Sequence, residues 1–236
     1  MKRLLAALLF SCTLLPLHTS AQFMFGPQIG FSYATLTGTD LSLNPKPEWH
    51  AGLLFDIGFA KHLSLQTSLL YSKRGYKYDH TTSVTTFPNT DTTIVTYTTA
   101  SVDAALGYID IPVLLNIYFG DHKGFMLNAG PQLSILLTNQ SVATTTTTVS
   151  TNGSNPQTTK PETETKFGFN PTDVSLVAGI GYKLPKLLML YVRACTGFGK
   201  VQKGNTDGNS ENVIKDSNAG HNFTIEAGLA LTFGSK

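Results

Sequence analysis

The sequence predicts an all-β protein, an eight-stranded antiparallel up-and-down transmembrane β-barrel with short periplasmic turns and four long extracellular loops. Three observations lead to this prediction. Apolar and polar residues alternate along eight segments, the connections alternate between short and long, and charged residues avoid the apolar face of each segment. Charged residues make up only 14% of the 236 residues, well below the usual quarter.

Eight segments carry the period of two that half-buried strands require, and no segment has a convincing helical period. The expected strands span about 23–36, 49–60, 63–77, 103–119, 123–138, 172–183, 187–199 and 222–233. Three connections are tight turns, at 60–62, 120–122 and 184–186. The other four are long, at about 37–48, 78–102, 139–171 and 200–221. Short and long connections alternate in this way in outer-membrane barrels.

The two faces of each expected strand differ in charge. In the strand 49–60, Trp49 and Leu53 share one face, while His50 and Asp56 share the other. Of the charges well inside the strands, only Lys73 lies on the apolar face; the others are Asp56, Arg74, Asp110, Asp173, Lys183, Arg193 and Glu226. A lipid-facing Arg or Lys at mid-depth costs about 2–4 kcal/mol, which explains this sorting.

Two soluble folds compete with the membrane barrel. A soluble eight-stranded barrel would place its large apolar side chains inside, and here the opposite face is small, polar and rich in glycine. A two-sheet sandwich is not separated by the alternation alone. The membrane barrel is favoured by the signal-peptide-like start of the chain, the aromatic strand ends and the charge-free apolar faces.

The start of the chain is typical of a signal peptide. Lys2 and Arg3 precede the apolar run 4–15, and small residues at 19–21 offer a cleavage site. We expect residues 1–21 to be removed and 22–236 to form the barrel domain; an uncleaved anchor and lipoprotein processing at Cys12 are the alternatives. Cleavage leaves Cys195 as the one cysteine and takes the formal charge from +2 to 0, which argues against a nucleic-acid partner.

Aromatic residues near the strand ends are typical of the girdles at the two membrane interfaces. The expected girdle consists of Trp49, Phe59, Tyr71, Phe119, Phe125 and Phe233. Phe233 also gives the last strand an aromatic end, a feature that barrel-insertion machinery recognises. We therefore expect three kinds of partner: outer-membrane lipid, including lipopolysaccharide, and the insertion machinery, together with a protein of an envelope or secretion assembly.

The inward face predicts a charge network in the lumen, made of Asp56, Arg74, Asp110, Lys183, Arg193 and Glu226. Unpaired charges there are costly, so we expect mutual pairing, with Arg193 and Glu226 on neighbouring strands. Eight strands enclose room only for side chains, which favours a plugged lumen over an open channel. Pro112 and Pro131 lie inside adjacent strands and lack a ladder donor. They predict a bulge or locally broken pairing, with a lateral opening to lipid as the functional alternative.

Two long connections have distinctive compositions. The threonine-rich stretch 143–150 buries little apolar area, so we expect it to be a mobile, solvated loop. Tyr76, Tyr78, Phe87 and Tyr97 accompany the connection 78–102. Together these loops are candidates for an outward binding surface, with contact to lipopolysaccharide as the alternative.

Several strand motifs resemble the PorT-type outer-membrane β-barrel family of Bacteroidetes. They are GPQIG at 26–30, HAGLL at 50–54, YIDIPVLL at 108–115, NAGP at 128–131, AGIGY at 178–182 and EAGL at 226–229. The resemblance covers nearly all of the chain after residue 21 except the long connections. It implies the barrel fold and the outer membrane, and it implies no activity, because the family is broad.

The leading functional hypothesis is a small outer-membrane barrel with a structural or interaction role, without enzymatic activity, cofactor or metal. A narrow porin-like channel for small solutes is the second hypothesis. The third is a rim hydrolase or acyltransferase, with His50 near the outer end of its strand beside Ser32, Ser72 or Asp173. No spacing specifies such a catalytic set.

Overall fold

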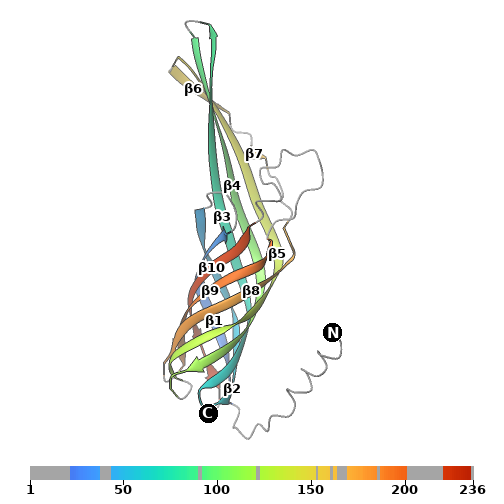
Figure 1. Cartoon of the computed structure of the whole chain (residues 1–236), viewed down its shortest axis with the longest axis vertical. Coiled ribbons are helices and arrows are strands. Elements are labelled where there is room, and N and C mark those ends of the chain that lie inside the picture. The colour runs from blue at the N-terminus through green and yellow to red at the C-terminus, as the bar shows by residue number, and fades with distance from the viewer. Residues whose placement is uncertain are drawn as a thin grey trace.

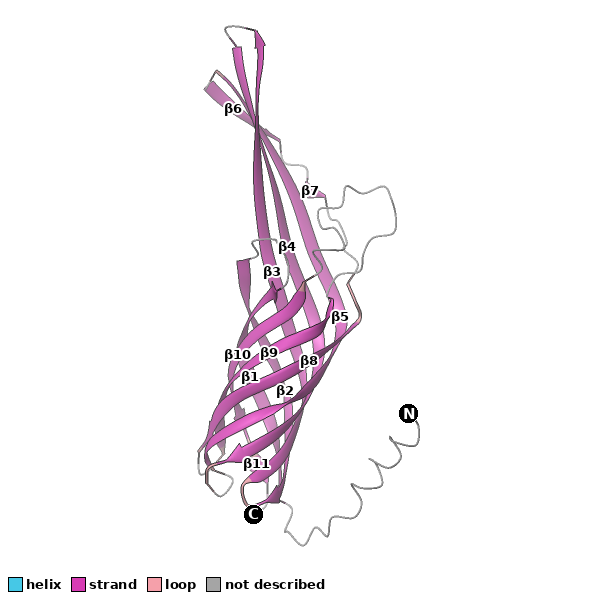
Figure 2. Cartoon of the chain, viewed as in Figure 1, coloured by secondary structure: helices cyan, strands magenta, loops and turns pink. Residues whose placement is uncertain are grey.

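The computed structural model describes residues 22–37, 44–89, 92–120, 123–152, 154–159, 162–163, 169–184, 187–200 and 220–234. Every regular element in this part of the chain is a β-strand (Figure 2). The predicted leader 1–21 lies outside the described residues, as do 38–43 and 201–219 of the predicted loops. Among the described residues, none forms a helix long and apolar enough to cross a membrane.

Eight long strands form a closed barrel (Figure 1). They are β1 (Gln22–Thr37), β2 (Asn44–Ala60), β3 (Leu63–Asn89), β4 (Thr92–Tyr118), β5 (Gly124–Thr151), β8 (Thr172–Lys183), β9 (Leu188–Lys200) and β10 (His221–Leu231). Each pairs antiparallel with the next, and β1 pairs with β10 from Gln28↔Ala230 to Thr37↔His221. This closure leaves no free edge in the wall and confirms the predicted fold class.

Three short strands complete the sheet. β6 (Ser154–Thr159) and β7 (Glu162–Thr163) pair with the far part of β5, outside the barrel. β11 (Phe233–Gly234) follows a break at Thr232 and pairs with the start of β1. The tight turns fall between β2 and β3, β4 and β5, and β8 and β9, at the end of the barrel where β1 begins. At Gly124, which follows the second turn, φ is +81°, a conformation that glycine adopts without strain.

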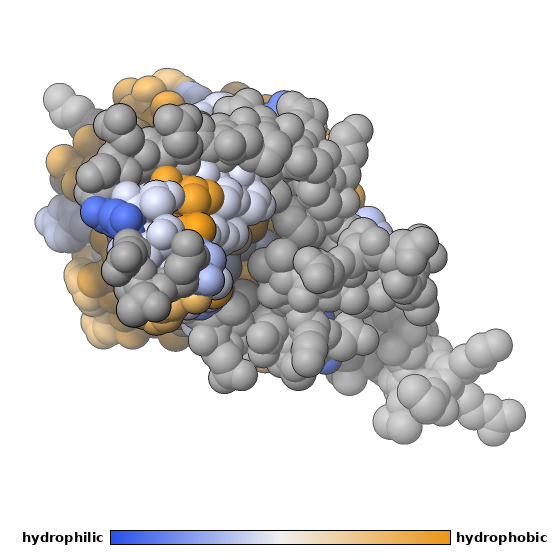
Figure 3. Space-filling model, turned by 90° about the horizontal axis from the view of Figure 1, so that it is seen from above, coloured by the Kyte–Doolittle hydropathy of each residue, from blue (hydrophilic) through white to orange (hydrophobic). Residues whose placement is uncertain are grey.

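The barrel wall is apolar outside and polar inside. On β1, Ile29 and Phe31 are 54% and 77% exposed, whereas the alternate residues Gln28 and Ser32 are buried. The same alternation runs through β8 and β9. Seen from above, apolar residues follow the outer wall, whereas the residues within it are mostly more hydrophilic, with a few apolar ones among them (Figure 3). Such a band of large apolar side chains is stable only against lipid.

β3, β4 and β5 continue far beyond the barrel as a three-stranded extension (Figure 1). We call it the arm: residues 78–89, 92–102 and 143–151, with β6 and β7 along the edge of β5. The prediction of a mobile threonine-rich loop at 143–150 was therefore wrong, as was the prediction of a long loop at 78–102. The physical reason is that threonine and valine are strong strand formers, and their backbones pair across the arm from Val102↔Ala143 to Ile94↔Thr151.

Pro112 and Pro131 coincide with two interruptions in the ladders of β4. Between β3 and β4, pairing stops at Thr67↔Val113 and resumes at Leu70↔Asp110. Between β4 and β5, it stops at Pro112↔Gln132 and resumes at Leu115↔Ala129. The register is the same on both sides of each gap, so the pairing is locally broken and not bulged. The missing proline N–H groups account for the gaps.

Candidate functional site

All six residues of the predicted charge network point into the lumen, where their exposed fractions lie between 0% and 6%. No continuous hydrogen-bonded network joins all six among the described residues. The structure separates them into layers along the barrel axis, each with its own hydrogen-bond partners.

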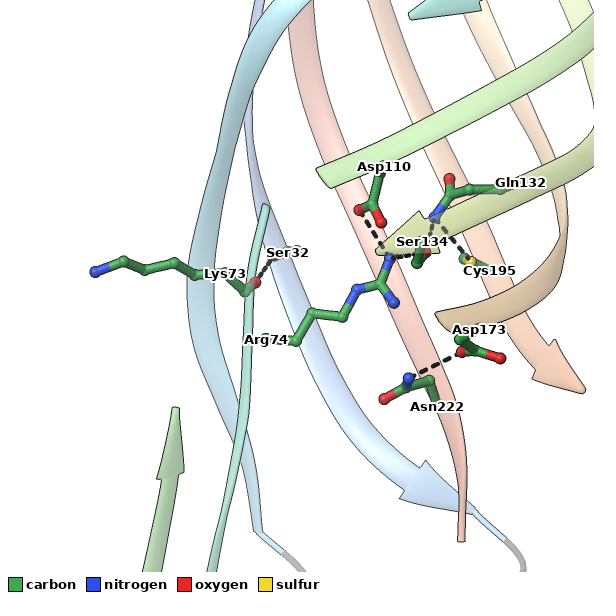
Figure 4. Close-up of polar contacts among 9 residues, drawn as sticks. All are labelled: Ser32, Lys73, Arg74, Asp110, Gln132, Ser134, Asp173, Cys195 and Asn222. Atoms are coloured by element: carbon green, nitrogen blue, oxygen red, sulfur yellow. Dashed lines mark hydrogen bonds and ion pairs between the residues drawn. The ribbon is translucent and has the colours of Figure 1, made fainter. Parts of the chain in front are cut away.

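The layer nearest the arm is built around Arg74. Its guanidinium donates to Asp110 Oδ2 at 2.8 Å and to Ser134 Oγ at 3.2 Å (Figure 4). It also lies 4.8 Å from the ring centroid of Tyr108. Figure 4 shows the neighbouring Lys73 side chain on the opposite side of β3 from Arg74. Alternation along one strand thus sends one charge into the lumen and the other outward.

Asp173 belongs to the same layer, although it was not among the six. Its carboxylate accepts a hydrogen bond from Asn222 Nδ2 at 2.9 Å (Figure 4). It also accepts one from the Gly199 amide at 3.2 Å. Gly197 makes room for it, because a Cβ there would lie 2.6 Å from Asp173 Oδ2. These contacts tie β8, β9 and β10 together just below the mouth of the barrel.

The middle layer contains Arg193, Glu226 and His50. Glu226 stands opposite Arg193 in the ladder, yet no ion pair joins them among the described residues, so this expected pairing was wrong. The Arg193 stem lies over Gly179 on the other neighbouring strand, where a Cβ would meet Arg193 Cγ at 2.7 Å. Its guanidinium lies 4.3 Å from the ring centroid of Tyr191.

The layer nearest the short turns contains Asp56 and Lys183. The Tyr118 hydroxyl donates to Asp56 Oδ2 at 3.0 Å, and Lys183 Nζ lies 5.8 Å from the Tyr118 ring centroid. Lys183 Nζ also contacts Met24 Sδ at 2.7 Å. Asp56 and Lys183 are therefore linked through Tyr118 rather than by a direct ion pair among the described contacts.

Apolar side chains also fill the lumen, and they were not predicted from the sequence. At the mouth below the arm lies a cluster that we call the mouth cluster: Leu36, Tyr76, Ala104, Leu106, Tyr108 and Phe169. A second cluster lies lower in the lumen: Leu54, Tyr118, Met126, Met189, Tyr191 and Ala230. Their large apolar members on inward-facing positions, such as Leu54 and Met126, were the available sequence signal. They fill the space that a polar lumen would leave open.

The predicted aromatic girdle lies on the outer wall in two groups. Trp49 and Tyr71 pack together near the arm end, with ring centroids 5.6 Å apart. Phe119 and Phe125 pack at 5.7 Å beside a short turn, at the end of the barrel that also carries Phe59 and Phe233. Lys73, the one charge on the apolar face, lies 5.7 Å from the Trp49 ring centroid, where a cation near an interface is tolerated.

A cluster of charges ties the base of the arm to β2, outside the membrane-spanning part of the strands. Lys46 Nζ lies 2.9 Å from Asp103 Oδ1 and 3.6 Å from Glu48 Oε1, and Lys77 lies 3.5 Å from Asp103. Partial burial disfavours the charge of Lys46, but Asp103 and Glu48 outweigh it and raise the pKa of Lys46. A raised lysine pKa means that this contact stabilises the fold at neutral pH and is lost only as the pH rises through that pKa.

His50 is not at the rim, so the hypothesis of a rim hydrolase or acyltransferase loses its candidate catalytic histidine. β2 begins at Asn44, six residues before His50, and His50 is fully buried in the lumen. Its Nε2 lies 2.7 Å from the Tyr191 hydroxyl. No hydrogen bond connects it to Ser32, Ser72 or Asp173 in the described part of the chain. Within that part, no group of three or more His, Cys, Asp or Glu side chains is arranged to hold a metal ion.

The family assignment follows from the match of residues 18–203 to a family model, the outer membrane protein beta-barrel domain. The chain belongs to this family. It is an outer-membrane protein, a small eight-stranded barrel of a mostly non-enzymatic family. No curated protein matches the sequence.

Solved outer-membrane proteins resemble this barrel at low identity. Ail, the attachment invasion locus protein of Yersinia pestis, is 12% identical, with 90% of this chain and 99% of that chain covered and a TM-score of 0.40. OprG from Pseudomonas aeruginosa is 11% identical, with 92% and 98% covered and a TM-score of 0.35. The outer membrane protease OmpT from Escherichia coli is 10% identical, with 91% and 96% covered and a TM-score of 0.29.

Proposed function

We propose that this outer-membrane barrel is a non-conducting, non-enzymatic anchor that presents the arm outside the cell to a protein of an envelope or secretion assembly. The observation that carries the proposal is the arm itself. β3 continues for twelve residues from Tyr78 to Asn89, which at about 3.3 Å per residue corresponds to roughly 40 Å. Holding so many residues in paired strands costs backbone entropy. A loop that only joins two barrel strands does not need such an ordered extension.

The filling of the lumen supports the non-conducting part of the proposal. The mouth cluster lies directly below the arm, and Tyr76 and Leu106 within it are 2% and 3% exposed. Below it, the Arg74–Asp110 pair and the lower apolar cluster occupy successive layers. A solute would have to displace both apolar and ion-paired side chains to cross.

A narrow channel is the second candidate, because one observation favours it. Several buried polar atoms have no partner among the described residues, including Arg74 Nη1, Arg193 Nη2 and Asp110 Oδ1. Buried polar groups of this kind are ordinarily satisfied by water, and a hydrated interior is the first requirement of a conduit. The apolar mouth cluster is the reason that we place this candidate second.

The strand motifs that resemble PorT-type barrels of Bacteroidetes support a role beside an envelope or secretion assembly. Lipid and lipopolysaccharide would contact the outer wall, and the outward-facing Phe233 on β11 would serve the insertion machinery. Residues 1–21 would act as a cleaved leader.

Two measurements test the proposed function. In planar bilayers, the purified barrel should give no steady pores; steady pores of uniform size would overturn the non-conducting anchor. On intact cells, added protease should cleave within 78–102, whereas the barrel strands stay protected. If the arm resists cleavage on intact cells and is cut only after the cells are broken, the proposal that the arm is displayed outside the cell is overturned.

A further inference from the structure

The two edges of the arm are treated differently by the chain. The edge of β5 is covered by β6 and β7, with pairs such as Thr147↔Thr159, Thr148↔Thr158 and Ala143↔Thr163. On the opposite edge, β2 stops pairing with β3 at Asn44↔Lys77. Beyond that point, no strand in the described part of the chain pairs with the outer side of β3. We call residues 78–86 on this side the β3 edge.

The β3 edge has few of the features that ordinarily protect a free strand. The pairing of β3 with β4 runs without a register shift from Tyr71 to Thr86, so no bulge twists the edge away. No Lys, Arg or Pro occurs between residues 78 and 87. The side chains from Asp79 to Thr86 are exposed, with Val84 at 57%. A long, regular edge with Asp79 as its one acidic residue presents unpaired N–H and C=O groups to any extended chain that meets it.

We propose that the β3 edge binds an extended segment of a partner polypeptide, which adds as a further strand to the arm. The inference rests on the proposed function, because it needs the arm to be displayed outside the cell. Backbone hydrogen bonds supply the affinity in strand addition, and the side chains of alternate residues supply the specificity. The molecule already uses this mode on the other side of the arm, where β6 adds to β5.

The side chains along the β3 edge define the chemistry of the partner segment. One face of β3 carries Tyr78, His80, Thr82 and Val84, and the other carries Asp79, Thr81, Ser83 and Thr85. Cross-strand pairs favour β-branched and aromatic residues opposite such positions, and like charges are disfavoured. The partner segment is therefore rich in Thr, Val or aromatic residues and has no acidic residue opposite Asp79.

A different chain fits this edge better than a second copy does. Two copies inserted in the same membrane carry β3 in the same direction, so their β3 edges would meet as parallel strands. Parallel pairing is slightly less stable per residue than antiparallel pairing. A partner with a free extended segment has no such restriction on direction.

Cysteine trapping on the full barrel, produced from Gln22 and folded in detergent micelles, tests this inference. Thr82→Cys places a thiol on the β3 edge, and Thr147→Cys is the matched control. Both threonines stand in one row across the arm, on either side of Thr98, but Thr147 faces the covered edge. Cys195 is buried and does not compete. The probe is a synthetic peptide with the sequence of residues 92–101, which pairs with β3 in the arm, and with the change Thr98→Cys at the ladder partner of Thr82, under an added mild oxidant.

The expected result is a disulfide adduct that forms at least about tenfold faster with Thr82→Cys than with Thr147→Cys. Methylating alternate backbone nitrogens of the peptide should slow trapping by at least about tenfold, because the backbone hydrogen bonds that hold an added strand are lost. Equal trapping by the two variants, or by the methylated peptide, would overturn strand addition. Thr82→Cys dimers that form without peptide would overturn the proposal of a different partner, because they would show that the edge binds a second copy of this chain.

These outcomes are independent of the proposed function. If protease reaches the arm on intact cells and the barrel forms no pores, yet the peptide is not trapped, the display stands and strand addition fails. If the arm is inaccessible on cells, the proposed function fails even where trapping succeeds in micelles.

Discussion

Arg74 on β3 reaches diagonally across the ladder to Asp110 on β4, and their side-chain atoms lie 2.8 Å apart. In the register, Arg74 stands opposite Leu106 and Asp110 stands opposite Leu70. Both charged side chains are almost fully buried. The pair therefore links positions four residues apart along the ladder and holds β3 and β4 together directly below the arm.

Removing one member of this pair should destabilise the barrel strongly. Asp110→Ala leaves the Arg74 guanidinium buried without its carboxylate, which costs about 3–5 kcal/mol. The measurement is the urea midpoint of the folded band on unboiled gels. Asp103→Ala is the control, because Asp103 is 43% exposed in its contacts with Lys46 and Lys77, and exposed pairs contribute about 1 kcal/mol or less. Equal midpoint shifts for both variants would contradict the assignment of Arg74 and Asp110 to a sealed interior.

The outer wall makes a depth-dependent prediction. Val192 faces outward near the middle of β9 and is 47% exposed, so Val192→Arg should cost about 2–4 kcal/mol in a bilayer. Thr172→Arg, at the arm end of β8 on the same outward face, should cost about 1 kcal/mol or less. Unfolding from lipid vesicles measures both. If the two substitutions cost the same, the apolar wall does not face the lipid core at Val192.

The mouth cluster predicts how the lumen could be opened. Leu106→Ala combined with Tyr76→Ala removes two buried side chains at the mouth and leaves a cavity. In planar bilayers we expect brief openings from this double variant and none from the unchanged barrel. Leu65→Ala with Leu69→Ala, on the outward face of β3, is the control and should stay silent. Silence of the mouth variant as well would place the seal in the lower cluster around Tyr118 and Met126.

The wall of the barrel was predictable from the sequence because lipid imposes one rule on every strand. Any charge at an outward position is penalised, so Asp56, Arg193 and Glu226 revealed the inward face from parity alone. The arm was not predictable by that rule, since both of its faces meet water and threonine occupies both. Its strand-forming residues, as in TTIVTYTT at 92–99, were the available signal. The polar, threonine-rich composition of these segments suggested loops instead.

The contents of the lumen were only partly predictable, for a different physical reason. Parity states which side chains point inward, but it does not state which of them meet. Arg193 and Glu226 are direct ladder neighbours, yet no ion pair joins them among the described residues, and the Arg193 guanidinium lies against the Tyr191 ring instead. Arg74 finds Asp110 four residues along the ladder instead. Such choices depend on the three-dimensional packing of eight inward faces at once.

Truncation of the arm should leave the barrel folded. Replacing residues 82–98 by an Asn-Gly turn joins β3 and β4 at a position where Thr81 and Thr99 are already ladder partners, with hydroxyl groups 3.0 Å apart. The barrel wall below Lys77↔Asp103 keeps its pairing, so the shift in gel mobility on boiling should persist. Gly52→Val is the contrasting variant, because a Cβ at Gly52 would lie 1.9 Å from the Leu69 carbonyl oxygen within the wall, and its folded band should weaken or disappear. A truncated barrel that fails to fold while Gly52→Val folds normally would mean that the arm is needed to assemble the barrel, and its length would then need no partner to explain it.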